Sequence, residues 1–335
     1  MFTSRRRLGA SAAIVGVLLA ATACSSSGGA NANKTDNGNG GSNVGKANTP
    51  KMTFAMVTHA PAGDTFFDII RKGADAAAGK DNVEYLYSND ANPSGQATLI
   101  QTAIDKKVDG IAVSIPNTGA VQSVMDKAAA AGIPIVMFNA GANDFKKLHA
   151  LMYFGQDESV AGEAAGARLK QEGAKKVLCV EQEQGQSQLE ARCDGVSKGL
   201  GGTVTKLYVT GTDIGDVQTK INASVTQDKS IDHVITLGAP FALAAVKSVK
   251  DAGSSAKVVT FDTNAELVDA VKSGDVGWAI DQQPYLQGYF AIDALWLYKT
   301  NGNILGGGGP VLTGPAFVDK TNVAAVSGFA KAGTR

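Results

Sequence analysis

The sequence has few of the residues from which catalytic and metal sites are usually built. It contains three histidines and three cysteines in 335 residues. The histidines at positions 59, 149 and 233 are too scattered to resemble the spacing of a metal site. No Gly-x-Gly-x-x-Gly follows an apolar run, so the fingerprint of a dinucleotide-binding enzyme is missing as well. These absences lower the expectation of an enzyme, and we expect neither a cofactor nor a metal.

The chain also lacks an excess of charge of either sign. Lys and Arg number 31 and Asp and Glu number 31, with no basic stripe along the chain. A nucleic-acid partner would require clustered Lys and Arg to neutralise phosphates, so this class of partner is not expected. The apolar run at the N-terminus, residues 8–20, is shorter than the roughly 20 residues that a membrane-spanning helix needs.

The N-terminus has the order of a secretory signal: Arg5–Arg7, the apolar run 8–20, then Ala21-Thr22-Ala23-Cys24. A cysteine after small residues resembles the lipobox of bacterial lipoproteins, although Ala21 stands where that motif prefers Leu. The resemblance implies lipidation of Cys24 and anchoring to the outer face of the cell membrane. A plain signal peptide with an incidental cysteine is the alternative. The arginines also resemble a twin-arginine signal, which leaves the export route open.

Residues 25–50 are mainly Ser, Gly, Asn and Ala, and this composition predicts a disordered tether. Residues 51–335 exceed what one hydrophobic core usually serves, which favours two lobes. Cys179 and Cys193 form an even pair in an exported chain, so a disulfide between a strand and the following helix is one interpretation. Two buried free thiols are the other.

From residue 51 onward, short apolar runs alternate with segments of helical length such as 94–106 and 119–131. The runs are 53–58, 83–87, 110–115, 134–138, 176–180, 205–209, 233–237, 257–261 and 277–280, with a last extended run at 310–318 after a glycine turn at 306–309. Continuous apolar runs between helices indicate parallel strands buried on both faces. The expected fold class is therefore α/β, with two doubly wound parallel-sheet lobes. Ligands of such sheets bind at the carboxyl ends of the strands.

Four segments at predicted strand ends, and one in the helix that follows residues 176–180, carry polar and aromatic residues in a recognisable order. They are Asp64-Thr65-Phe66-Phe67, Phe138-Asn139-Ala140, Gln188-Leu189-Glu190-Ala191-Arg192, Phe261-Asp262-Thr263-Asn264 and Asp281-Gln282-Gln283-Pro284. Together they resemble the ribose-type periplasmic binding proteins of ABC sugar importers, across residues 51 to about 320. The resemblance implies a type I periplasmic binding fold, in which two lobes joined by crossing hinge strands close on a ligand.

The resemblance also implies which residues meet the ligand. They are Asp64, Phe66, Phe67, Ser114 and Asn139 from the first lobe, and Arg192, Asp262 and Gln282 from the second lobe and hinge. Aromatic rings stack on the C–H face of a sugar or polyol, and charged side chains form strong hydrogen bonds with its hydroxyls in a dry cleft.

Simpler roles compete with these assignments. Phe66 and Phe67 can be ordinary helix core, although adjacent helical positions point in different directions. Asp262 can be a helix N-cap. Arg192, within a helix, can be a solvated surface charge. Trp278 is expected to pack within its lobe rather than to serve as a stacking platform.

The chain departs from the ribose-type pattern at two places. Asn139-Ala140 stands where that family carries Asp-Arg, and Gly238 stands where it carries Asn. Ribose would lose hydrogen-bond partners worth roughly 1–3 kcal/mol each, so ribose itself is not expected. The candidate ligands that remain are a different pentose or hexose, a sugar alcohol and a small furanone-like signalling molecule.

The sequence thus predicts a non-enzymatic, monomeric solute-binding component that delivers a small sugar or sugar alcohol to an ABC permease and ATPase. The expected divisions are signal peptide 1–24, tether 25–50, one lobe of 51–153 plus about 284–306, and a second of 154–283 plus about 307–335. Three alternatives stay open: an exported ligand-sensing receptor subunit, a sugar-binding transcription regulator and an exported enzyme. The export signal and the missing N-terminal helix-turn-helix argue against the regulator.

Overall fold

The computed structural model describes residues 48–61 and 63–335, which belong to one compact unit. The expected signal peptide, Cys24 and the tether up to residue 47 lie outside the described residues. At Thr49 the chain already contacts the folded part, because the Trp296 indole N–H donates to the Thr49 hydroxyl over 3.1 Å.

Two six-stranded sheets form the framework of the described chain. The first runs in the order β11 (Pro310–Leu312), β5 (Met152–Gly155), β4 (Ile135–Phe138), β3 (Gly110–Val113), β1 (Thr53–Thr58) and β2 (Glu84–Asn89). The second runs in the order β12 (Ala316–Asp319), β10 (Trp278–Asp281), β9 (Lys257–Phe261), β8 (His233–Thr236), β6 (Lys176–Glu181) and β7 (Thr203–Tyr208). Every pairing is parallel except that of β12 with β10. This is the doubly wound α/β fold that the alternating apolar runs predicted.

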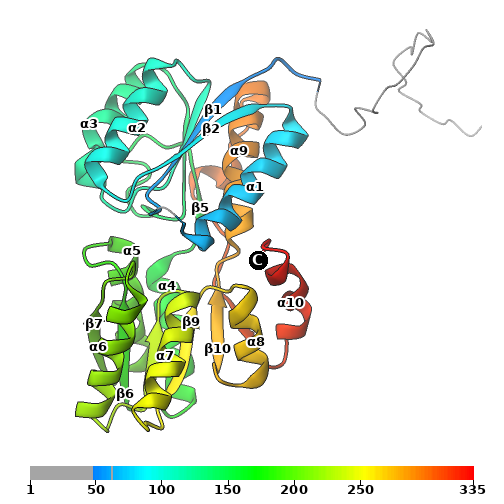
Figure 1. Ribbon diagram of the computed structural model, residues 1–335. Helices are drawn as coiled ribbons and strands as arrows, with labels where there is room; N and C mark the ends of the chain where they lie inside the picture. The colour runs from blue at the N-terminus through cyan, green and yellow to red at the C-terminus, as the bar shows by residue number, and fades with distance from the viewer. Residues whose placement is uncertain (1–47, 62) are drawn as a thin grey trace, which may run out of the picture. The chain divides into compact units, whose positions relative to one another are not determined.

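Helices cover both faces of each sheet (Figure 1). Around the first sheet lie α1 (Thr65–Asp81), α2 (Pro93–Asp105), α3 (Thr118–Ala130) and α9 (Pro284–Asn301). Around the second lie α4 (Glu158–Gln171), α5 (Ser187–Leu200), α6 (Ile214–Gln227), α7 (Ala239–Asp251), α8 (Ala265–Ser273) and α10 (Val323–Lys331). The apolar residues of α1 and α9 share one core with the first sheet, and those of α2 and α3 share another.

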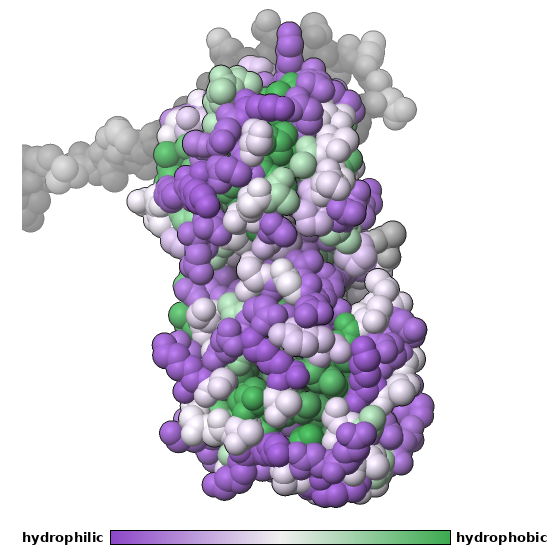
Figure 2. All heavy atoms as spheres, turned by 90° about the vertical axis from the view of Figure 1, so that its left-hand side faces the viewer, coloured by the Kyte–Doolittle hydropathy of each residue, from purple (hydrophilic) through white to green (hydrophobic). Residues whose placement is uncertain are grey.

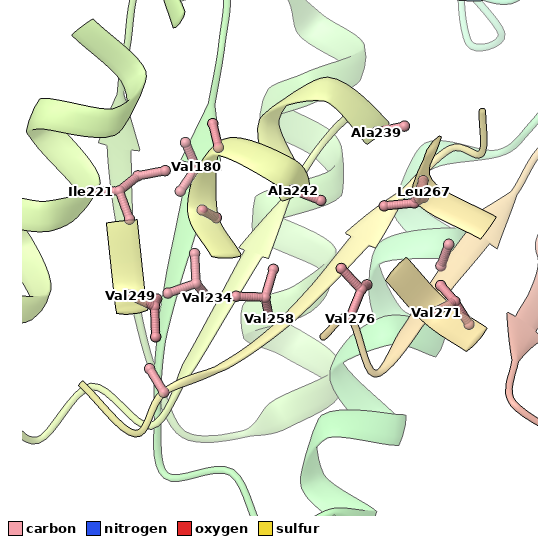
Figure 3. Packing of buried hydrophobic residues seen from close by; sticks show 14 of the residues in the cluster. Val180, Ile221, Val234, Ala239, Ala242, Val249, Val258, Leu267, Val271 and Val276 are labelled. Atoms are coloured by element: carbon pink, nitrogen blue, oxygen red, sulfur yellow. The ribbon is translucent and has the colours of Figure 1, made fainter. Parts of the chain in front are cut away.

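The second sheet likewise separates two apolar cores. On one face, valines of β6, β8 and β9 pack against aliphatic residues of α6, α7 and α8, among them Ile221, Val249 and Leu267 (Figure 3). On the other face, α4 and α5 pack against the sheet. Trp278 is buried there, edge-on to Phe317, and its indole N–H donates to Glu172, so the lobe-packing role expected for it is what the structure shows.

The chain passes between the two sheets three times: after β5, after β10, and between β11 and β12. The third passage corrects the sequence-based boundary of about 306, because Pro310–Leu312 pairs with β5 of the first sheet. The extended run 310–318 is therefore two strands in two sheets. The glycine turn before it contains a short 3₁₀ turn, Leu305–Gly308. The sequence analysis also missed β5.

Hydrogen bonds between glutamines and Thr313 connect two of these crossing segments. The Gln283 side chain donates to the Thr313 carbonyl over 2.7 Å, and the Gln287 side chain donates to the Thr313 hydroxyl over 3.2 Å. The crossings therefore form a joined hinge rather than separate linkers.

Polar side chains cover most of the face drawn in Figure 2, in keeping with the balanced charges of the sequence. In the described part of the chain, none of the helices has the length and apolar character needed to cross a bilayer.

Candidate functional site

A cavity of about 350 Å³ lies where the strand tips of the two sheets meet. Both lobes and the hinge line it. The lining includes His59, Pro61, Asp64, Phe66, Phe67 and Asn139 from the first lobe, and Gln182, Glu183, Gln188, Arg192, Ile214, Pro240, Phe241, Asp262, Asn264 and Gln282 from the second lobe and hinge. The cavity thus sits where the carboxyl ends of parallel strands are expected to bind a ligand.

Asp64 begins α1 and presents the two phenylalanines to the cavity. One Asp64 carboxylate oxygen accepts from the backbone N–H of Phe66 at 2.8 Å and of Phe67 at 3.4 Å, as an N-cap does. Burial raises the pKa of Asp64, against the opposing effect of these two bonds. The Phe66 and Phe67 rings meet edge to face, with centroids 5.5 Å apart. Phe67 is also buried in the core, so this pair both packs and lines the cavity.

Ser114 corrects one expectation from the sequence, because it does not line the cavity. Its side chain is fully buried, and its hydroxyl lies 2.8 Å from Nδ1 of His59. His59 occupies the cavity wall in its place and meets the Phe67 ring at 5.0 Å. Burial lowers the pKa of His59 to about 4, so the ring is neutral at neutral pH. Ser114 therefore lies behind His59, outside the lining of the cavity.

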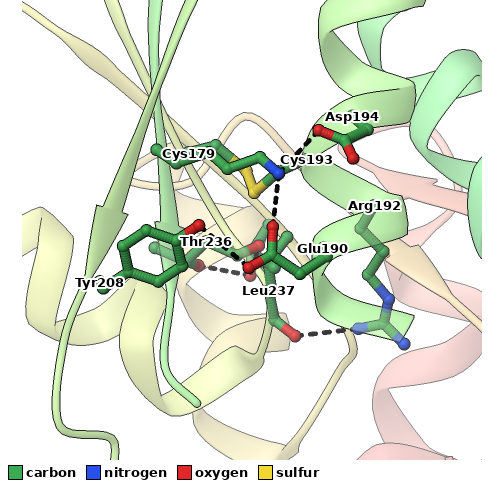
Figure 4. The surroundings of a disulfide bond; sticks show 10 residues. Cys179, Glu190, Arg192, Cys193, Asp194, Tyr208, Thr236 and Leu237 are labelled. Carbon is green, nitrogen blue, oxygen red and sulfur yellow. Dashed lines mark hydrogen bonds and ion pairs between the residues drawn. A yellow bond between two sulfur atoms is a disulfide. The ribbon is translucent and has the colours of Figure 1, made fainter. Parts of the chain in front are cut away.

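The Arg192 guanidinium is the central cation of the site. It forms a two-pronged ion pair with Glu158, with N···O distances of 2.6 and 3.0 Å. It also donates to the Leu237 carbonyl at 3.1 Å (Figure 4). Its side chain is only 3% exposed, so it is not the solvated surface charge that a helical arginine usually is. A guanidinium has five N–H donors, and these bonds use three. In the described part of the chain, two N–H groups are left without a hydrogen bond, and Arg192 is part of the cavity lining.

Asp262 and Gln282 join the second lobe to the hinge. The Gln282 side chain donates to Asp262 over 2.7 Å, and Asn139 of the first lobe donates to Gln282 over 3.3 Å. Burial raises the pKa of Asp262 to about 7, although Arg192, 3.8 Å away, acts in the opposite direction. Asn139 and Asp262 have positive φ angles of 61° and 65°. Left-handed backbone is uncommon for non-glycine residues, and at strand tips it marks a functional region.

The alternative capping role for Asp262 belongs to a different residue. Asn264 is the N-cap of α8, and its side-chain oxygen accepts from the N–H groups of Glu266 and Leu267 at 3.1 and 2.7 Å. The Asp262 side chain is therefore not needed at the helix start.

The structure thus brings seven of the eight expected residues to one cavity and leaves out Ser114. Those that line it are Asp64, Phe66, Phe67, Asn139, Arg192, Asp262 and Gln282. Sequence reasoning missed His59, Gln182, Glu183, Gln188 and Phe241 on the wall, and Glu158 behind Arg192. Position after a predicted strand is a signal that His59 and Gln182 carry. Glu158 carried no such signal, because β5 before it was not predicted.

A disulfide between Cys179 of β6 and Cys193 of α5 fastens the helix that bears Arg192 (Figure 4). The two Cα atoms are 5.9 Å apart. Glycines let α4 approach α5 closely: a Cβ added to Gly162 would lie 2.4 Å from the Arg192 carbonyl oxygen. The disulfide and this close packing hold Arg192 opposite Glu158.

Removing the disulfide is expected to destabilise the folded chain without changing its fold. The bond spans 14 residues, and closing a loop of that size contributes about 3 kcal/mol to the free energy of unfolding. Urea denaturation of Cys179→Ala/Cys193→Ala measures this loss. Reductant should lower the midpoint of the wild type and leave the double variant unaffected. A wild type that does not respond to reductant would contradict the prediction.

Within residues 48–61 and 63–335 no cluster of His, Cys, Asp and Glu is arranged to hold a metal ion. The string Gly195-Val196-Ser197-Lys198-Gly199 matches the letters of a serine-hydrolase elbow but lies inside α5. A nucleophile of that kind requires a sharp turn between a strand and a helix. This serine is therefore not placed as a nucleophile.

Residues 54–303 match the family described as the periplasmic binding protein domain, and the chain belongs to that family of exported, non-enzymatic binding proteins. It is similar to a carbohydrate transporter from Acidothermus cellulolyticus 11B solved in complex with myo-inositol. That likeness has 59% identity and a TM-score of 0.84, and it covers 85% of this chain and 100% of the other.

Two curated relatives are more distant. The xylose/arabinose-binding protein XylF of Sulfolobus acidocaldarius is 24% identical over 263 residues, which is 72% of this chain but only 64% of that protein. The ribose import binding protein RbsB of Bacillus subtilis is 24% identical over 237 residues, covering 68% of this chain and 76% of that protein. Both relatives are named for the sugars that they bind.

Proposed function

We propose that this chain captures one ring of a neutral, hydroxyl-rich molecule, a cyclic polyol or a monosaccharide, and delivers it to an ABC permease. The observation that carries the proposal is the make-up of the cavity. Aromatic rings of Phe66 and Phe67 face one part, and the hydrogen-bonding groups of Arg192, Asp262 and Gln282 face another. The 59% identical protein, crystallised with myo-inositol, makes that cyclitol the first candidate.

The mechanism that follows is capture between two lobes. The first lobe supplies rings that stack on C–H bonds, and the second supplies charged partners for hydroxyls. A ligand that contacts both lobes stabilises the arrangement in which they are close. The hinge glutamines lie between these two sets of contacts, so ligand contact and lobe movement are connected at Gln282.

Isothermal titration calorimetry of the chain from residue 48 onward tests the proposal with myo-inositol, D-ribose, D-xylose, L-arabinose and D-tagatose. We expect saturable binding of myo-inositol or one of the sugars, with ribose weak because Ala140 and Gly238 offer no polar partner. A folded protein that binds none of these compounds would contradict the proposal that the ligand is a cyclic polyol or a monosaccharide.

The alternative function is that of an exported ligand-sensing receptor subunit. It would use the same cavity, but the ligand-bound protein would contact a membrane receptor in place of an ABC permease. A small furanone-like ligand would leave several of the polar groups around Arg192 without a partner, which is costly in a buried site. Uptake of the radiolabelled ligand by cells with and without the gene decides between an importer component and a sensor. Uptake that does not depend on the gene would favour the sensor.

Anchoring through Cys24, which lies outside the described residues, is a separate part of the proposal. Cys24→Ser is expected to move the protein from the membrane fraction to the culture medium, because the thiol is the site of lipid attachment. Cell fractionation followed by immunoblotting measures this shift. A variant that stays membrane-bound to the same extent as the wild type would rule out Cys24 as the anchor.

A further inference from the structure

The wall of the cavity carries more acidic than basic groups. Three carboxyl side chains line it, those of Asp64, Glu183 and Asp262, against the single guanidinium of Arg192. That guanidinium already forms a two-pronged ion pair with Glu158, so it cannot also balance the charge of the carboxylates on the wall. A ligand that enters the cavity therefore meets a surplus of negative charge.

Asp64 and Glu183 are the two carboxylates that have only neutral partners. Asp64 accepts from backbone N–H groups at the start of α1, and Glu183 accepts from the Gln186 side chain over 2.9 Å. Lys220 lies beside Glu183 at the mouth of the cavity, but its ammonium group is held by Asp216 at 3.0 Å. Within the described chain, neither carboxylate forms an ion pair with a basic side chain.

The same two carboxylates come from opposite lobes and face one space. Asp64 stands at the start of α1 in the first lobe, and Glu183 follows β6 in the second. Burial raises the pKa of Glu183, and the charge of Asp64 across the cavity raises it further. His59 on the same wall adds no positive charge, because burial lowers its pKa to about 4. A neutral ligand held between the lobes would leave these two like charges to repel each other.

Hydrogen-bonding atoms without a partner also lie on this wall. The Thr263 side chain is only 5% exposed, and the side-chain oxygens of Gln182 and Gln188 are shielded from solvent. In the part of the chain that the structure describes, none of these three oxygens has a hydrogen-bond partner, and all three residues line the cavity. Buried polar atoms are normally satisfied, and an amide oxygen only accepts. The wall therefore indicates a ligand that is rich in hydrogen-bond donors.

We propose that the ligand carries a positive charge: it is a cyclic polyol or monosaccharide in which an ammonium group stands in place of one hydroxyl. The inference rests on the proposed function, because the ring and its remaining hydroxyls bind as described there. The ammonium group lies between Asp64 and Glu183 and donates to both carboxylates. Its charge removes the repulsion between them that opposes closure of the lobes.

An ammonium group fits this place better than a hydroxyl does. A hydroxyl has one N–H or O–H equivalent to donate, so it can satisfy only one of the two carboxylates, whereas an ammonium group has three donors. Hydrogen bonds in which donor and acceptor are both charged are also stronger than those of a neutral hydroxyl. The charged ligand is therefore expected to bind at least tenfold more tightly than its neutral counterpart.

Isothermal titration calorimetry at pH 7 compares each amine with the neutral compound that it matches. The pairs are 1-amino-1-deoxy-myo-inositol with myo-inositol, and D-glucosamine with D-glucose. We expect the amine of at least one pair to bind at least tenfold more tightly than its neutral partner. The ratio of the two affinities within a pair is the quantity that reports on the charge.

Two variants locate the ammonium group. Glu183→Gln and Asp64→Asn each remove one of the two carboxylates, and each should reduce the preference for the amine to less than threefold. Asparagine also caps helices, so Asp64→Asn keeps the start of α1. Asp68→Asn, at an exposed carboxylate on the same helix but outside the cavity lining, is the matched control and should keep the wild-type preference.

The outcomes separate this inference from the proposed function. If the neutral compounds bind and neither amine binds more tightly than its partner, the charged ligand is wrong and the proposed function stands. If the preference for the amine survives both Glu183→Gln and Asp64→Asn, the ammonium group does not lie between these carboxylates and the inference is wrong as well. If the folded protein binds neither the amines nor any of the neutral compounds, the proposed function itself fails.

Discussion

Arg192→Met is expected to weaken ligand binding by more than about a hundredfold, because it removes charge-assisted donors from the cavity. The same change leaves Glu158, which is 7% exposed, as a buried carboxylate without its partner. Breaking a buried ion pair in this way costs about 3–5 kcal/mol of stability. Calorimetry with the tightest ligand measures the first effect, and urea denaturation measures the second.

A double variant separates the binding role of Arg192 from its structural role. Arg192→Met/Glu158→Leu removes both charges of the buried pair, and stability should return part of the way towards the wild type, because only Asp262 still lacks its cationic neighbour. Ligand binding by the double variant should remain as weak as that of Arg192→Met. Lys198→Met, on the same helix in an exposed ion pair with Glu163, is the control and should alter neither quantity. If the double variant binds as the wild type does, Arg192 is not a ligand contact.

The α/β architecture could be predicted because its signal is local. Strands such as β3, β4 and β8 are buried along their whole length, and strands buried on both faces are built mainly from apolar residues. The helices between them start at residues that the sequence marks, such as Asn92 before Pro93 at the start of α2. Alternation of the two patterns was enough to infer two parallel sheets.

The partners of the last strands could not be predicted, because pairing is a tertiary property. The run 310–318 looks continuous in the sequence, yet β11 pairs with β5 in the first sheet and β12 with β10 in the second. Nothing in the run itself marks the change of sheet apart from Gly314-Pro315. β5 was missed although residues 150–154 form a continuous apolar run like those of the predicted strands.

The cavity was predictable at its strand tips but not behind them. Asp262 and Asn139 follow apolar runs directly, so the rule that strand ends carry the ligand site located them. Ser114 stands near the end of such a run, within residues 110–115, yet its hydroxyl is directed to His59. Glu158 acts only through Arg192, and that pairing depends on how α4 packs on α5. Groups that act through another residue leave no local pattern.

Ligand affinity is expected to fall about fiftyfold as the pH is lowered from 7 to 5, through Asp262. Burial raises the pKa of this carboxyl to about 7. Below that pH the free protein holds Asp262 protonated, whereas a ligand hydroxyl that donates to the carboxylate requires the ionised form. The first pH unit below 7 therefore costs about a factor of five in affinity, and the next about a factor of ten. Calorimetry at pH 5, 6, 7 and 8 measures the change.

Asp262→Asn isolates this contribution from the other titrating groups. Asp64 and Glu183 also line the cavity with pKa values raised chiefly by burial, so the difference between wild type and variant is the informative quantity. The variant should bind weakly at every pH and lose the steep dependence between pH 5 and 7. Glu181, with a pKa raised by burial to about 8, lies outside the cavity lining, so Glu181→Gln should keep the wild-type profile. An Asp262→Asn variant that retains the wild-type pH dependence would show that the proton which competes with the ligand resides elsewhere. Arg192 and Gln282 both contact Asp262. In that case Asp262 would serve to join the second lobe to the hinge, and its charge would not contribute to ligand binding.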